Sequence, residues 1–130
     1  MAIKKYRVTD EAENYIDLQV DTDVLTSELA THINNFWSGN KDRLDKENGD
    51  VVAVVVRFFG ALALRFFLSE GGVTSIPLTH ENSTQYWTNR VIDFVVEGLP
   101  STSAALGIQL FDALVIVPEF CDVRLSEITS

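Results

Sequence analysis

The sequence VVAVVVRFFGALALRFFL, residues 51–68, decides how this chain folds. The run is long enough for a helix, and only Arg57 and Arg65 interrupt its apolar residues. A bilayer core needs about 20 apolar residues, but an arginine near its centre costs roughly 2.5 to 3.5 kcal/mol. A helix that is apolar on nearly every side is otherwise one that neighbouring elements surround. We therefore predict a buried central helix over about residues 51–69 and no membrane partner.

The residues at both ends of this run fit a helix. Asp50 is a good N-cap, and Gly71 and Gly72 supply the left-handed residue that commonly ends a helix. Gly60, in the middle, costs about 1 kcal/mol relative to alanine. A glycine at such a position usually marks the close approach of another backbone. We therefore expect a tight contact at Gly60.

Composition and charge restrict the class of protein. With 130 residues and 46% hydrophobic content, the chain suits one globular domain covering residues 1–130. A formal net charge of -9 argues against direct binding to nucleic acid or to an anionic membrane, because those partners need a basic face. The single cysteine, Cys121, excludes an internal disulfide, and the N-terminus lacks the apolar core of a signal peptide. We expect a cytoplasmic protein.

Hydrophobic periodicity predicts strands at both ends of the chain and helices between them. Alternation predicts an N-terminal hairpin from residues 4–9 and 15–21, and a C-terminal hairpin from residues 108–117 and 121–128. Helical spacing indicates helices from about residue 24 or 27 to 37 and from 83 to 97. Residues 38–50 are either a short exposed helix or a loop, and residues 100–107 a loop. The order predicts an α+β fold with an antiparallel sheet of about four strands and three or four helices on one face.

The strand at residues 108–117 is apolar on both faces, which suits a central position in the sheet. Helices would cover one face. The other face, which includes Phe111 and Val115, would need a second cover, and a second copy of the chain is one candidate. We therefore expect a protein partner or self-association, with a homodimer as the simplest form.

Arg57 and Arg65 lie eight residues apart and project from roughly the same side of one helix. A buried arginine needs a carboxylate partner, and Asp112 is the one charge inside the longest apolar strand. The structural interpretation is an ion pair between helix and sheet. The functional alternative is that the two guanidinium groups hold a small anion such as phosphate or carboxylate in a cleft.

Aromatic residues are further candidates for an interface. Phe36 and Trp37 are adjacent on one predicted helix, and Tyr86 and Trp87 on another, so both members of a pair cannot face the core. One member of each pair packs inside, and the other either covers a loop or contacts a protein. The sequence contains no nucleophile elbow, phosphate loop or metal-ligand spacing. We expect no cofactor and no metal, and favour a protein that is not an enzyme.

Several segments together resemble a small bacterial domain family of unknown function, found on proteobacterial chromosomes and mobile elements. They are LTSELATHINNFWS, GDVVAVVVRFFG, QYWTNRVID with VEGLP, and the closing strand pair. The residues that carry the resemblance are Asn34, Asn35, Phe36, Trp37, Arg57, Phe58 and Gly60. The resemblance implies a stand-alone, cytoplasmic α+β protein and transfers no active site.

Three functions remain open on the sequence. The favoured one is a non-catalytic interaction module, accessory or regulatory, that presents its acidic N-terminal third or its outer sheet face to another protein. The second is a small-anion binder or enzyme that uses Arg57 and Arg65. The third is a mimic of nucleic acid, which would need carboxylates spaced like phosphates along one face.

Overall fold

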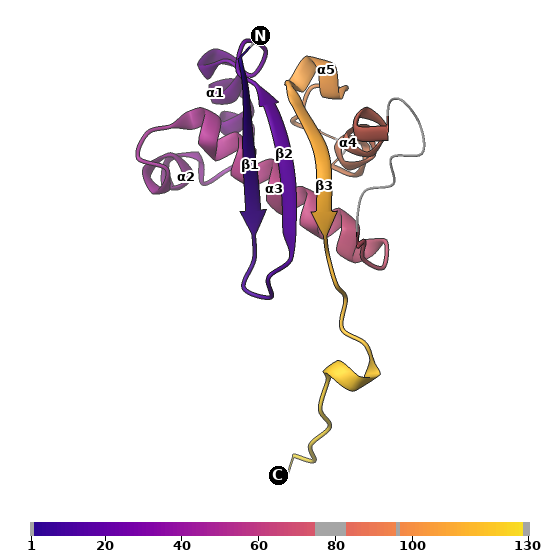
Figure 1. The fold of residues 1–130 in the computed structure, drawn as a ribbon. Helices are drawn as coiled ribbons and strands as arrows, with labels where there is room; N and C mark the ends of the chain where they lie inside the picture. Colours follow the sequence, from indigo (N-terminus) through magenta and orange to yellow (C-terminus); the bar gives the residue numbers. More distant parts are fainter. Residues whose placement is uncertain (1, 75–82, 96, 129–130) are drawn as a thin grey trace.

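The computed structural model describes residues 2–74, 83–95 and 97–128. A three-stranded antiparallel sheet in the order β1-β2-β3 carries the helices on one face, as Figure 1 shows. This arrangement confirms the α+β class. The elements are β1 (Ile3–Thr9), β2 (Tyr15–Asp21), α1 (Ser27–Phe36), α2 (Asn40–Lys46), α3 (Val51–Ser69), α4 (Ser83–Val95), α5 (Ser103–Leu106), β3 (Ile108–Leu114) and the 3-10 turn η1 (Phe120–Asp122).

The N-terminal hairpin is confirmed. Strands β1 and β2 pair from Ile3 with Asp21 to Thr9 with Tyr15. The turn between them is organised by Asp10, whose carboxylate accepts hydrogen bonds from the backbone amides of Ala12 at 2.9 Å and Asn14 at 3.0 Å. This is the local bonding that makes aspartate a turn residue.

Helix α3 is the central helix, and both of its ends are as predicted. The Asp50 carboxylate accepts from the amide of Ala53 at 3.1 Å, and Gly71 and Gly72 follow the helix with φ of 91° and 92°. By length and hydropathy α3 qualifies as a membrane-spanning candidate among the described residues, with half of its most apolar window buried inside the fold. The prediction that neighbours surround α3 is wrong on one side, where Arg57 is exposed to solvent.

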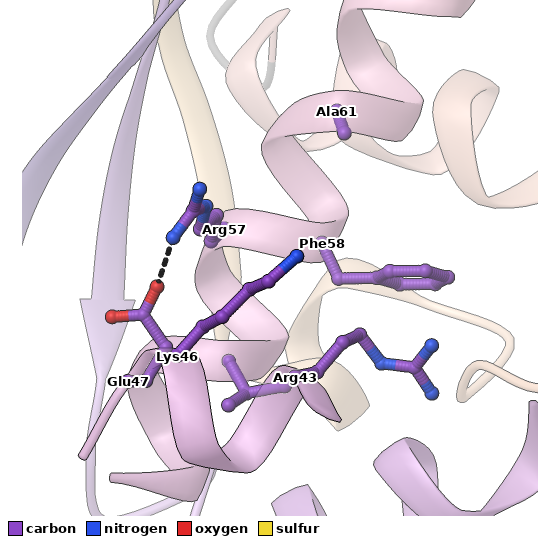
Figure 2. A pocket seen from close by; sticks show the side chains of 7 residues that line it. Arg43, Lys46, Glu47, Arg57, Phe58 and Ala61 are labelled. Atoms are coloured by element: carbon purple, nitrogen blue, oxygen red, sulfur yellow. Dashed lines mark hydrogen bonds and ion pairs between the residues drawn. The ribbon is translucent and has the colours of Figure 1, made fainter. Parts of the chain in front are cut away.

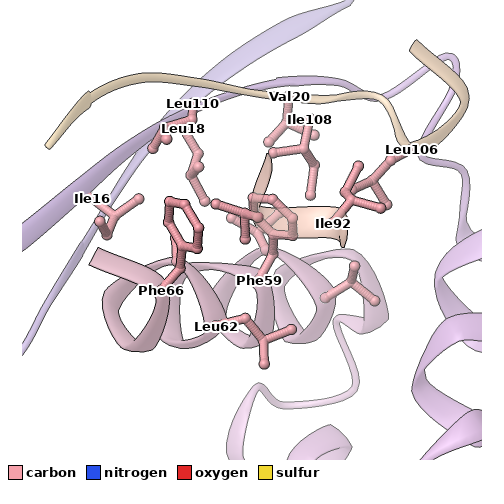
Figure 3. Packing of buried hydrophobic residues seen from close by; sticks show 14 of the residues in the cluster. Ile16, Leu18, Val20, Phe59, Leu62, Phe66, Ile92, Leu106, Ile108 and Leu110 are labelled. Atoms are coloured by element: carbon pink, nitrogen blue, oxygen red, sulfur yellow. The ribbon is translucent and has the colours of Figure 1, made fainter. Parts of the chain in front are cut away.

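The core lies between the helices and the inner face of the sheet, as Figure 3 shows. Phe59 and Phe66 of α3 lie beneath Leu18 of β2 and Leu110 of β3. Burying a side chain of this size is worth roughly 1.5 to 3 kcal/mol. The largest fully buried members of this core are Ile16, Leu18, Val20, Leu25, Ile33, Val55, Phe59, Val91, Leu106, Ile108, Leu110 and Val115.

At Gly60, α3 packs closely against β1. A Cβ built on this glycine would lie 2.5 Å from Cγ2 of Val8, 2.7 Å from its Cβ and 2.9 Å from Cγ1. The tight contact predicted at Gly60 is therefore present. It is made with a side chain of β1 instead of a backbone.

The helices exceed the predicted three or four. Segment 38–50 contains a short helix, α2, and residues 100–107 contain the single turn α5 where we predicted a loop. Thr102 starts that turn by accepting a hydrogen bond from the amide of Ala105 at 3.2 Å. A threonine N-cap followed by Ser-Ala-Ala-Leu is a helix start. We predicted a loop because the segment is short.

The predicted C-terminal hairpin is wrong. Strand β3 ends at Leu114, and among the described residues no strand follows it. The outward side of β3, where a fourth strand would pair, is already occupied. The Ser103 hydroxyl donates to the carbonyl of Ile108 and the amide of Leu110 donates to the Thr88 hydroxyl, both at 2.8 Å, and further along Val115 exchanges two backbone hydrogen bonds with Val73.

A bulge in β3 overturns the prediction that Phe111 and Val115 share an exposed face. The pairing with β2 shifts between Asp17 and Leu18, so that Leu110 pairs with Leu18 and Asp112 with Asp17. One extra residue therefore reverses the faces that follow it. Val115 is only 1% exposed and belongs to the core, whereas Phe111 is half-buried on the outer face.

Candidate functional site

The structure separates the three charged residues that the sequence brought together. The Arg57 side chain is 66% exposed, and its Nη1 lies 2.6 Å from Oε1 of Glu47. Arg65 is exposed, without an ion pair or hydrogen bond to any described residue. Asp112 of β3 pairs with Asp17 of β2. Its carboxylate accepts a hydrogen bond from the amide of Ala113 at 2.9 Å. The ion pair predicted between α3 and Asp112 is therefore not formed.

Arg57 instead borders a hollow between α2 and α3, which Figure 2 shows. This α2–α3 hollow has a volume of about 190 Å³, and Arg65 does not line it. Its lining residues are Arg43, Lys46, Glu47, Val54, Arg57, Phe58 and Ala61. Three cationic groups and one carboxylate thus meet over an apolar floor in a chain whose net charge is -9.

Arg43 is committed to the fold. Its Nε donates to Oδ1 of Asn34 at 2.9 Å, its Nη1 to the carbonyl of Ser38 at 2.8 Å, and its Nη2 to the carbonyls of Asn34 and Trp37 at 3.0 and 3.1 Å. The guanidinium therefore satisfies carbonyls at the C-terminal end of α1, where a positive charge also suits the helix dipole. Lys46 and Arg57 are left as the cations of the hollow that face solvent.

The aromatic pairs divide as expected. Phe36 and Tyr86 are each 53% exposed, whereas Trp37 and Trp87 pack against the core. Trp37 lies 4.7 Å from the ring centre of Phe58. Arg90 donates to the Tyr86 hydroxyl at 3.2 Å, and this bond, helped by nearby acids, raises the pKa of Arg90. The Tyr86 hydroxyl is therefore already hydrogen-bonded within the chain.

The outer face of the sheet is covered by charged side chains. Arg7 makes a two-pronged ion pair with Asp17, at 2.7 and 2.9 Å, and its guanidinium lies 3.9 Å from the ring centre of Tyr15. The hydrogen bond to Asp17 raises the pKa of Arg7. Lys5 covers Phe111 with its ammonium 5.5 Å from the ring centre. The apolar outer face expected from the sequence is therefore polar.

The most exposed large apolar side chains lie instead in residues 116–128, which we call the C-terminal arm. Figure 1 shows the arm running away from the sheet after β3. Phe120 is 93% exposed, Leu125 100% and Ile128 92%, and Ile116 and Val123 are also exposed. The turn η1 lies within the arm and has a capping box between Glu119 and Asp122. The arm exposes a row of apolar groups to water, which is uncommon unless a partner covers them.

A second hollow lies beside β1, and we call it the edge groove. Its volume is about 360 Å³. The lining is apolar at Tyr6, Val8, Ala53 and Val56, and polar at Arg7, Thr9, Glu47 and Arg57. The ion pair of Arg57 with Glu47 stands between the edge groove and the α2–α3 hollow.

Sequence reasoning missed Arg43 and the edge groove. Arg43 follows Asn34 by nine residues across a helix break, and no local pattern marks that pairing. The only signal in the sequence was the Asn34-Asn35 pair itself, because asparagine is a poor helix former that competes for backbone hydrogen bonds.

Known proteins are similar to part of this chain, and a family model matches most of it. A 54-residue stretch is 39% identical to "Lambda prophage-derived protein ea10" of Escherichia coli O6:H1, and equally to "Protein ea10" of Escherichia phage lambda. The stretch covers 42% of this chain and 44% of each relative, so the chain matches less than half the length of these proteins. No solved structure matches the chain.

These relatives come from a phage and a prophage, which confirms the resemblance to a family found on mobile elements. The model of one family matches residues 15–125, from the first residue of β2 into the C-terminal arm. The chain belongs to the family described as protein of unknown function (DUF2528).

Proposed function

We propose that this protein is a cytoplasmic, non-catalytic interaction module whose binding element is the C-terminal arm. The observation that carries the proposal is the exposure of Phe120, Val123, Leu125 and Ile128 along one extended segment. Full burial of one such side chain is worth roughly 1.5 to 3 kcal/mol, so a partner that covers several gains substantial affinity. The family match, which reaches residue 125, supports the arm as part of the domain.

The arrangement of the chain supports binding rather than chemistry. The described residues contain no group of three or more histidine, cysteine or acidic side chains placed to hold a metal ion. Aromatic residues and exposed apolar rows are typical anchors of protein interfaces. The proposed partner is a protein. The arm offers side chains on alternate sides and backbone groups that can pair with another strand. The net charge of -9 disfavours nucleic acid.

Photo-crosslinking tests this function. We would replace Phe120 by p-benzoylphenylalanine, an aromatic exchange at a solvent-exposed position, and irradiate a lysate of cells that express the full chain. Phe36, which is 53% exposed on α1, is the matched control position. We expect a protein adduct from position 120 and none from position 36. No adduct from position 120, or an adduct from position 36 alone, would refute the proposal.

A second candidate is a binder of small anions at the α2–α3 hollow. The observation that favours it is the excess of cations there, with Lys46 exposed and without an ion pair to any described residue. In this form the anion site uses Lys46 and Arg57, because Arg65 does not reach the hollow. Isothermal titration calorimetry with inorganic phosphate tests this second function. We expect Lys46→Gln to weaken binding several-fold and Lys41→Gln, on the same helix outside the hollow, to leave it unchanged.

A further inference from the structure

The two edges of the sheet differ. On β3, hydroxyls of Ser103 and Thr88 and the backbone of Val73 occupy the outward side. On β1, among the described residues, no hydrogen bond reaches the outward side. An open edge of this kind is a ready site for pairing with another strand.

The residues that form the open edge follow from the pairing of β1 with β2. The backbone amide of Thr22 donates to the carbonyl of Ala2, and the backbone amide of Asp10 donates to the carbonyl of Asn14. The even-numbered residues of β1 therefore form the hydrogen bonds across the hairpin. Because bonding alternates along an antiparallel strand, the odd-numbered residues turn their N–H and C=O groups outward. The open edge is therefore made by Ile3, Lys5, Arg7 and Thr9.

The edge groove lies directly beside this open edge. A strand added to β1 would point alternate side chains into it, toward Val8 and Val56, while its backbone bonds to the outward groups. This is the usual form of peptide recognition by strand addition: the backbone supplies affinity and alternate pockets supply specificity.

The C-terminal arm has the chemistry of the missing strand. Its apolar residues alternate at Cys121, Val123 and Leu125, so one face of an added strand would be apolar. Residues 122–128 span about 23 Å when extended, which matches the seven residues of β1.

The charges of the two elements are complementary. The arm carries Glu119, Asp122 and Glu127 against the single Arg124. Strand β1 carries Lys4, Lys5 and Arg7 in a chain that is otherwise acidic. Complementary potentials of this kind select a partner and its register.

The arm that fits this edge comes from a second copy. In Figure 1 the arm leaves the sheet from β3, with β2 between it and β1, and runs away from the body. The arm therefore lies away from the open edge of its own β1. A second copy presents an identical arm, and reciprocal exchange covers both arms with one two-fold interface.

We propose, resting on the arm as the binding element, that the C-terminal arm of one copy adds as a strand to β1 of a second copy and inserts Val123 and Leu125 into the edge groove. The exchange is reciprocal and produces a homodimer.

Sedimentation equilibrium of the full chain tests the dimer. We expect the wild type at twice the 14.5 kDa mass of one chain. Leu125→Asp, at a fully exposed position, should return the mass of one chain, whereas Ser126→Asp, on the opposite face of the arm, should remain a dimer. Lys5→Pro removes one outward N–H and should also give a monomer, while Lys5→Arg keeps that N–H and the positive charge and should not. Circular dichroism checks that each variant folds.

The outcomes separate this proposal from the interaction function. A monomeric wild type, with an adduct from position 120 to a different protein, overturns self-pairing and leaves the interaction function standing. No adduct at all overturns both. A dimer that persists in Leu125→Asp and in Lys5→Pro places the contact elsewhere and overturns the proposal.

Disulfide trapping then tests the contact itself. The exposed Cys121 is the only cysteine, so the native chain can be mixed with a chain that carries Cys121→Ser and either Ile3→Cys or Thr9→Cys. A disulfide needs Cα atoms within about 7 Å. A bond to one end of β1 supports the proposal and gives the direction of the added strand. A bond to neither end contradicts it.

Discussion

Replacing Gly60 by alanine tests the packing of α3 on the sheet. Judged by helix propensity alone, Gly60→Ala should stabilise the protein by about 1 kcal/mol. The structure predicts the opposite sign, because the new Cβ would lie 2.5 to 2.9 Å from three atoms of Val8. One of these is the Cβ of Val8, which no rotamer change can move. The helix and strand must separate by about 1 Å to reach ordinary contact near 3.5 Å.

The size of the effect follows from two opposing contributions. Overpacking of a well-filled site costs about 1 to 3 kcal/mol, and the gain in propensity offsets about 1 of these. We expect a net loss of up to about 2 kcal/mol in the free energy of unfolding. Urea denaturation followed by tryptophan fluorescence measures it.

A double variant isolates the contact. Val8→Gly removes all three colliding atoms, so Gly60→Ala combined with Val8→Gly should be about 1 to 3 kcal/mol more stable than the sum of the single variants predicts. The reasoning fails if Gly60→Ala is more stable than the wild type, or if the two changes add within about 0.5 kcal/mol.

Three further substitutions test single contacts by thermal and urea unfolding. Arg43→Ala should cost about 2 kcal/mol or more, because the carbonyls at the end of α1 lose a charged donor, and Arg43→Lys should recover less than half of that loss. Thr88→Val should cost about 1 to 3 kcal/mol by leaving the amide of Leu110 unpaired, and Thr88→Ser should be close to the wild type. Asp50→Ala should cost about 1 kcal/mol through the lost N-cap, and Asp50→Ser much less. An unchanged midpoint for any of the alanine or valine variants would show that its contact does not matter for stability.

The parts of the fold that local chemistry determines could be predicted. The hairpin of β1 and β2 follows from two-residue alternation and the Asp10 turn, and α3 follows from its apolar run between Asp50 and the paired glycines. In both cases the signal lies within about twenty residues, so the sequence alone carries it.

The parts that depend on distant contacts could not be predicted. Residues 121–128 have the pattern of a strand, but the edge of β3 is closed by Ser103 and by Thr88 and Val73, the last two remote from β3 in sequence. The bulge that reverses Phe111 relative to Val115 also leaves no local signal. The charge partner of Arg57 depends on where the short helix α2 places Glu47.

The closed edge of β3 has a consequence for how large an assembly of this protein can become. A sheet with two bare rims can recruit neighbours from both directions, and this is how ribbons and fibrils grow without limit. Here side-chain hydroxyls block one rim, so lateral growth can proceed from the other rim only. Strand addition can therefore extend this sheet from the β1 side only, and two copies cannot join through β3.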